Sequence, residues 1–119
     1  MARGKLDREN DPPVENGRSA LWFKIPDELQ IDAGVLAILG DFVPFGTHTA
    51  LPAGATGGLT SLDNTIRVVD LVPTTWVLLD VQIYSVANGF SQGIVHLWAE
   101  DGTLLATASQ SCQVRSPKK

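Results

Sequence analysis

The stretch Ile31–Val43, IDAGVLAILGDFV, decides the fold of this chain. Its apolar side chains surround a helical axis almost completely, a pattern that is typical of a buried helix. Asp32 can cap the N-terminus with its carboxylate, and Pro44 and Gly46 follow as stop signals. The sequence therefore predicts one helix over this stretch, with a single carboxylate, Asp41, in its last turn.

The rest of the chain is predicted to form strands around that helix. Apolar and polar residues alternate with a period of two from Leu59 onward, and a short apolar run that Pro26 ends precedes the helix. The predicted strands are Ala20–Ile25, Leu59–Val69, Thr75–Tyr84, Gly93–Glu100 and Thr103–Val114. The stretch Phe45–Gly58, rich in Gly, Thr and Pro, is predicted to be a long surface loop, and such loops are usually functional.

The dipeptide Asp101-Gly102 is a strong hairpin signal between the last two strands. With a type I′ turn, one apolar face pairs Leu104, Ala106, Ala108 and Gln110 with Ala99, Leu97, Val95 and Gly93. The matching inward set of the second long strand is Val77, Leu79, Val81 and Ile83. The alanines leave room for the helix, and Gln110 is the polar exception on this face. A curved antiparallel sheet of about five strands around one central helix, an α+β arrangement, is the layout of the hotdog fold.

Length and composition indicate one ordinary globular domain. The chain has 119 residues, which is too short for two domains. Residues 1–18 are polar, with few apolar side chains, and are predicted to form a disordered arm before a hotdog domain over 19–119. The net charge of −4 gives no indication of nucleic-acid binding.

Cellular location is predicted from cysteine content and hydropathy. The one cysteine, Cys112, excludes an internal disulfide framework and fits a reducing compartment. No apolar run approaches the roughly 20 residues that span a bilayer, and no secretory signal is visible. A cytoplasmic protein is expected.

Several motifs that could indicate a functional site are better explained as ordinary structural features. Gly89–Gly93, GFSQG, matches the G-x-S-x-G elbow of α/β-hydrolases, but it enters a predicted strand and no helix follows. The glycines of Gly54–Gly58 lack the Lys-Ser/Thr of a phosphate loop. No metal-ligand spacing surrounds His48 or His96, and the register places His96 on the outer face. Cys112 is expected to be a small buried hydrophobe, and no metal or cofactor is predicted.

Asp41 is the first candidate for chemistry. A carboxylate in the last turn of a helix faces the unfavourable end of the macrodipole, and an apolar setting adds a desolvation cost. Both are features of general bases and of groups that position water. An exposed last turn, with Asp41 meeting only solvent, explains the pattern equally well.

Most of the chain from the helix onward resembles the acyl-CoA thioesterase II (TesB-like) family, in its C-terminal hotdog half. The segments that carry the resemblance are VLAILGDFVP (Val35–Pro44), TSLDNTI (Thr60–Ile66), WVLLDVQIYS (Trp76–Ser85) and EDGTLLATASQSCQVR (Glu100–Arg115). The resemblance implies hydrolysis of fatty acyl-CoA to free acid and CoA, without a cofactor. It also implies that a water is positioned by an Asp, a Ser or Thr hydroxyl and a Gln.

Matched position by position, these catalytic roles fall on Asp41, Ser61 and Gln110. Strand alternation alone places Thr60 on the apolar face instead of Ser61, so Thr60 is retained as a substrate-binding alternative unless a bulge intervenes. Asn64 departs from the family, which commonly has a histidine there, and the change puts the packing of this strand or the edge of the site in question.

The resemblance also bears on assembly, because such enzymes usually carry two hotdog repeats and this sequence shows one. A single hotdog leaves a sheet edge unpaired, so a homodimer, a higher oligomer or pairing with a second hotdog subunit is expected. The rival function is a non-catalytic module that binds acyl groups or completes such an assembly. A hydratase acting on enoyl-CoA is disfavoured, since neither histidine is placed beside an acidic residue as that chemistry needs.

Overall fold

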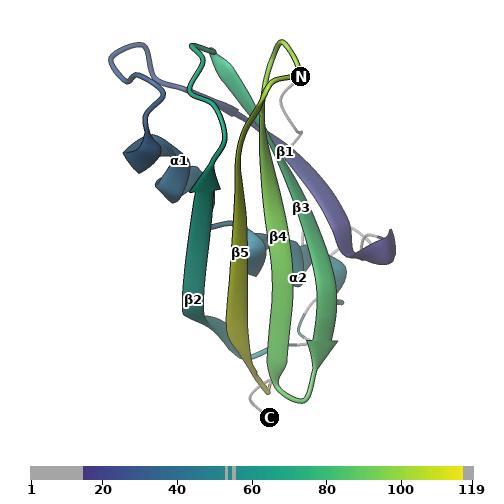
Figure 1. The fold of residues 1–119 in the computed structure, drawn as a ribbon. Helices are drawn as coiled ribbons and strands as arrows, with labels where there is room; N and C mark the ends of the chain where they lie inside the picture. Colours follow the sequence, from purple (N-terminus) through teal and green to yellow (C-terminus); the bar gives the residue numbers. More distant parts are fainter. Residues whose placement is uncertain (1–14, 53, 55, 117–119) are drawn as a thin grey trace.

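The computed structural model describes residues 15–52, 54 and 56–116 (Figure 1). The elements are the short 3-10 helix η1 (Glu15–Gly17), strand β1 (Arg18–Lys24), helices α1 (Ala33–Leu39) and α2 (Val43–Ala50), and strands β2 (Gly58–Val68), β3 (Trp76–Ala87), β4 (Phe90–Ala99) and β5 (Leu104–Arg115). The predicted arm over 1–18 lies mostly outside the described residues, and its last residue, Arg18, begins β1. No helix in the described ranges is long and apolar enough to cross a membrane.

The five strands form one antiparallel sheet in the order β1-β3-β4-β5-β2. Strands β1 and β2 are therefore its two edges. Helix α2 lies across one face of the sheet, behind it in the view of Figure 1, while α1 lies to the side of β2. This is the hotdog arrangement that the strand pattern predicts.

The core lies between α2 and the concave face of the sheet. The predicted inward set of β3 is confirmed, since Val77, Leu79, Val81 and Ile83 are all buried. Glycines allow the close approach of helix and sheet: a Cβ atom on Gly46 of α2 would overlap Val81 of β3, and one on Gly93 of β4 would lie 3.3 Å from the Cγ1 of Val43 on α2. These two positions need a residue without a side chain.

The predicted pairing of β4 with β5 is confirmed for Gly93–Gln110, Val95–Ala108 and Leu97–Ala106. It is wrong at the turn, where Leu104 pairs with Trp98 and not with Ala99. The register shifts beyond Leu97, and Leu105 is fully buried. The hairpin is thus longer than a two-residue turn and gains a core side chain from its extra residue.

The predicted single helix over 31–43 is instead two helical segments. Helix α1 ends at Leu39, with Gly40 as its C-cap, and α2 begins at Val43. The predicted surface loop from Phe45 is accordingly wrong over its first six residues, which belong to α2. Both predictions fail because they treat Pro44 as a stop signal. It lies in the first turn of α2, where the N–H that proline lacks would have no acceptor within the helix.

Candidate active site

Gln110 is the centre of the candidate active site. It lies on the inner face of β5 and is only 3% exposed. Its side-chain Nε2 donates one hydrogen bond to Oδ1 of Asp41, at 2.7 Å, and another to Oγ of Ser61, at 2.8 Å. The structure therefore brings together the three residues for which the family resemblance implies catalysis.

Asp41 occupies the turn between the two helices. Its backbone N–H donates to the carbonyl of Ile38 at 3.2 Å, which closes the end of α1, and its side chain is exposed. The expectation that Asp41 lies in the last turn of the central helix is wrong, because α2 starts two residues after it. Asp41 thus adjoins the N-terminal end of α2, the end of a helix that favours a negative charge.

Ser61 reaches Gln110 because β2 contains a bulge. The ladder between β2 and β5 pairs Ser61 with Cys112 and then Asp63 with Ser111, so Leu62 has no partner across the strands. This extra residue reverses the alternation before it, and Ser61 points to the same inner face as Gln110. Thr60, paired with Gln113, points to the other face and is not part of the hydrogen-bonded group.

The direction of the hydrogen bonds assigns a role to each polar atom. Both hydrogens of the Gln110 amide are donated, and the Ser61 hydroxyl donates to the carbonyl oxygen of Asp63 at 3.2 Å. Ser61 Oγ can therefore take part in a further hydrogen bond only as an acceptor. The second carboxylate oxygen of Asp41 can likewise only accept. Oε1 of Gln110 is buried and has no hydrogen-bond partner among the described residues.

A second polar group lies deeper, under α2. Thr47 Oγ1 donates to Ser91 Oγ at 3.1 Å, and both side chains are fully buried. Ser91 is the serine of the G-x-S-x-G pattern, and its place on a buried strand is inconsistent with a nucleophile elbow. Cys112, between Ser91 and Ser61 in the sheet, is also buried, and burial raises the pKa of its thiol.

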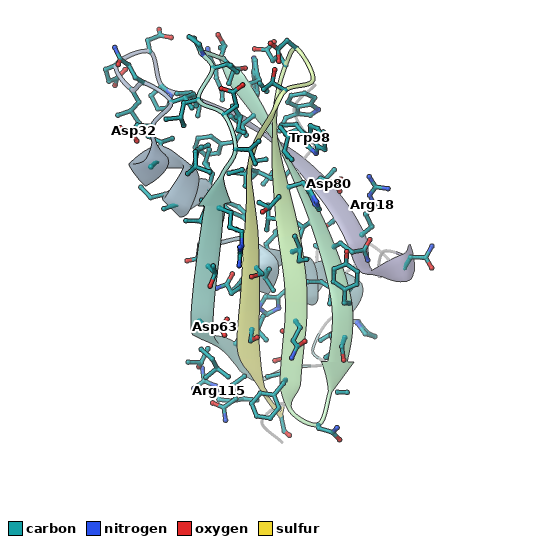
Figure 2. The ribbon with its side chains drawn as sticks, in the orientation of Figure 1. Arg18, Asp32, Asp63, Asp80, Trp98 and Arg115 are labelled. Atoms are coloured by element: carbon teal, nitrogen blue, oxygen red, sulfur yellow. The ribbon has the colours of Figure 1, made fainter. Side chains whose placement is uncertain are left out.

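The histidines take no part in this group. His48 lies on α2, and His96 lies on the outer face of the sheet, as predicted, stacked on Trp98 with ring centroids 6.3 Å apart. Figure 2 shows Trp98 on the near side of the sheet, with Arg18 and Asp80 nearby on the same side. Across the described ranges, no three His, Cys, Asp or Glu side chains are grouped to hold a metal ion.

Comparison with known families gives one match that spans nearly the whole sequence. The acyl-CoA thioesterase C-terminal domain family matches residues 3–114. Among solved structures, a candidate thioesterase from Novosphingobium aromaticivorans is 39% identical, with a TM-score of 0.77 over 87% of this chain. The chain spans only 39% of the length of that protein. No curated protein matches the sequence.

More distant structures share the fold. The SAV0944 thioesterase from Staphylococcus aureus, solved as a mutant, is 10% identical with a TM-score of 0.74, and the match covers 86% of this chain and 88% of that one. The BH2602 protein from Bacillus halodurans, solved with CoA, is 16% identical with a TM-score of 0.70, and the match covers 80% of this chain and 66% of that one.

Proposed function

The chain belongs to the acyl-CoA thioesterase C-terminal domain family, and we propose that it hydrolyses fatty acyl-CoA thioesters to free acid and CoA. The observation that carries the proposal is the amide of Gln110, which joins a carboxylate and a hydroxyl from two other segments. A buried amide that orients two open acceptors is suited to holding one water molecule.

In the proposed mechanism, that water donates one hydrogen bond to Asp41 and the other to Ser61. Both of its hydrogens are then directed at the protein, and a lone pair is directed at the thioester carbonyl. Asp41 accepts the proton as the water attacks, so it acts as the general base. Ser61 serves as an acceptor and not as a nucleophile, because its own hydrogen is donated to the carbonyl of Asp63.

The attack places negative charge on the carbonyl oxygen, which needs hydrogen-bond donors. Val43 begins α2 two residues after Asp41, and its backbone N–H, like the first N–H groups of any helix, has no acceptor within the helix. Pro44 supplies no N–H to the first turn. Collapse of the intermediate expels the CoA thiolate, and the proton held by Asp41 returns to it, so the products are the acid and CoA.

We further propose that the domain works while paired with a second hotdog domain along the edge strand β2. Large apolar side chains are exposed on and beside this edge, on Ile38 (73%), Leu62 (54%), Val68 (43%) and Val69 (58%). Asp41 and Ser61 are exposed in the same region, so a partner there would enclose the site. The partner is a second copy or a different hotdog chain.

The decisive experiment measures thiol release from acyl-CoA substrates of several chain lengths by the wild type and by Asp41→Asn. Loss of the base is expected to lower kcat by roughly 10²-fold or more. Asp27→Asn, which neutralises an exposed carboxylate in the turn after β1, is the matched control and is expected to keep full activity. Activity of Asp41→Asn within about threefold of wild type would contradict the assignment of the base.

The alternative is a non-catalytic domain that completes an assembly with another subunit. It is favoured by one observation, that this chain spans 39% of the length of its Novosphingobium relative. Activity of the purified chain alone, measured with its mass in solution, separates the two functions. A chain that binds CoA but releases no thiol at any substrate length supports the alternative.

A further inference from the structure

Asp63 makes hydrogen bonds that stabilise the bulge in β2. The residue lies on β2 (Figure 2), directly after the unpaired Leu62. Its carboxylate oxygen Oδ1 accepts a hydrogen bond from the backbone N–H of Ser111, its cross-strand partner, at 2.8 Å. A bulge disrupts the regular ladder at this point, and the side chain of Asp63 supplies an acceptor to the strand opposite.

The main chain of Asp63 makes the second contact. Its carbonyl oxygen accepts the hydroxyl hydrogen of Ser61 at 3.2 Å. One residue therefore both joins the bulge to β5 and directs the Ser61 hydroxyl, so that Ser61 Oγ receives the Gln110 amide as an acceptor.

The bulge decides which hydroxyl faces the site. After the bulge, Asn64 and Ile66 pair with Gln110 and Ala108 on the inner face. If β2 had no bulge, the same alternation would extend from Asn64 toward the N-terminus of the strand. Thr60 would then point inward and Ser61 outward. With the bulge, Ser61 faces Gln110 and Thr60 faces away.

We propose that Asp63 is a positioning residue for the thioesterase reaction: it fixes the β2 bulge and thereby selects Ser61 over Thr60 for the water-binding site. The inference rests on the proposed function. Asp63 is not itself catalytic, because its side chain lies on the opposite face of the sheet from Gln110. There it lines a shallow hollow together with the outward-facing Thr65, Ser109 and Ser111.

The test compares Asp63→Asn, Asp63→Glu and Asp63→Ala in the full chain. An asparagine oxygen accepts from Ser111 at the same reach, so Asp63→Asn is expected to keep kcat within about threefold. The other two variants remove or displace that oxygen and are expected to lower kcat by roughly 10- to 100-fold, with KM changed less than about threefold. Thr65→Ala, the next outward-facing residue on β2, is the matched control and is expected to keep wild-type kinetics.

A double-mutant cycle isolates the route of the effect. In a Ser61→Ala background, Asp63→Glu is expected to cause no further loss, since it acts only through Ser61. Hydrogen exchange at the Ser111 amide gives a readout that needs no activity: it is expected to be faster in Asp63→Glu than in the wild type and Asp63→Asn.

Each alternative result has a definite meaning. A loss of kcat in Asp63→Asn with wild-type kcat in Asp63→Glu would show that the charge acts and not the position of the oxygen, and would overturn the positioning role. Unchanged kinetics and unchanged Ser111 exchange in Asp63→Glu would overturn it as well. If Asp63→Ala fails to fold, the Asn and Glu variants decide the question. If the wild type releases no thiol, the proposed function fails, while the exchange measurement still tests whether Asp63 holds the bulge.

Discussion

Gly40 lies so close to Ala108 that a Cβ atom on Gly40 would stand 2.9 Å from the Cβ of Ala108. The turn between α1 and α2 is thus seated directly on β5, two residues along the strand from Gln110. This contact places Asp41, the next residue, within reach of the Gln110 amide. The position of the proposed base depends on two small residues packed against each other.

The first prediction concerns this contact. Gly40→Ala is expected to lower the free energy of unfolding by about 1–3 kcal/mol through overpacking, and to lower kcat as Asp41 moves away from Gln110. The backbone of Gly40 is helical, at φ −75°, so the clash and not the backbone conformation is the cause. Urea unfolding and thiol release measure the two effects.

A control for that variant is Gly34→Ala, in the exposed first turn of α1. A Cβ there meets only Asp32 Oδ1, at 3.4 Å. This change is expected to leave kcat unaltered and to stabilise the helix by roughly 0.5–1 kcal/mol. Equal behaviour of the two alanine variants would show that the contact of Gly40 with Ala108 does not position Asp41.

The second prediction separates activity from stability at Gln110. Gln110→Leu removes the amide that joins Asp41 and Ser61, so kcat is expected to fall by roughly 10²-fold. Because Oε1 of Gln110 is buried with no partner among the described residues, its removal is expected to leave stability unchanged or to raise it by about 1–3 kcal/mol. A large loss of stability in this variant would show that the two hydrogen bonds of Nε2 stabilise the fold by more than the unpartnered Oε1 costs.

The matched change at the same position is Gln110→Glu. It introduces a second carboxylate beside Asp41 in a buried site, and both burial and the like charge raise the pKa of the introduced group. The loss in the free energy of unfolding that Gln110→Glu causes is therefore absent below the pKa of glutamate in the unfolded chain, and it appears as the pH rises above that pKa. Urea unfolding is expected to show this variant destabilised at about pH 7 and closer to wild type at about pH 5.

The third prediction concerns Cys112. Burial raises the pKa of its thiol, so the native state holds the proton more tightly than the unfolded chain does. The stability that this provides is complete below the unfolded-state pKa of about 8.5 and is lost as the pH rises through the higher folded-state value. The wild type is expected to lose more stability than Cys112→Ala between about pH 8 and pH 10.

Thiol labelling gives a second measure of the same residue. The folded chain is expected to react slowly with a thiol reagent at neutral pH, and the unfolded chain rapidly. Fast labelling of the folded chain would show that Cys112 is accessible and would contradict its burial.

The fourth prediction tests the proposed pairing through β2. Leu62→Lys places a charge on the unpaired residue of the bulge and is expected to weaken the assembly by roughly 10- to 100-fold, as measured by sedimentation. Tyr84→Lys is the control, because Tyr84 is 65% exposed on β3, away from the edge strand. A mass unaffected by Leu62→Lys would exclude this edge as the interface.

Most of the fold could be predicted from the sequence because strands carry local signals. Alternating apolar residues fixed the inward face of β3, and Asp101-Gly102 fixed the pairing of β4 with β5 up to Leu97. Helix α2 could not be predicted, since Pro44 and Gly46 are also stop signals. Their actual roles, a first-turn proline and a glycine pressed against Val81, become visible only when the helix is packed on the sheet.

The candidate site, too, could be predicted from the sequence only in part. Asp41, Ser61 and Gln110 follow from the family resemblance, while strand alternation alone selects Thr60. The bulge that reverses this choice is held by hydrogen bonds between Asp63 and Ser111 on different strands. Such long-range contacts leave no periodic trace in the sequence, and so Asp63 received no role from it.

The position of Ser61 on an edge strand has a consequence for how the protein would lose activity. Strand β2 is bonded to the sheet on one side only, through β5, whereas the core residues of β3 and β4 are covered by α2. Local fraying of β2 would separate Ser61 from Gln110 while the core remained intact. On heating, an unpartnered chain would therefore lose activity at a lower temperature than the one at which its tryptophan fluorescence reports unfolding. A partner strand along β2 would bring the temperature of inactivation close to the temperature of unfolding.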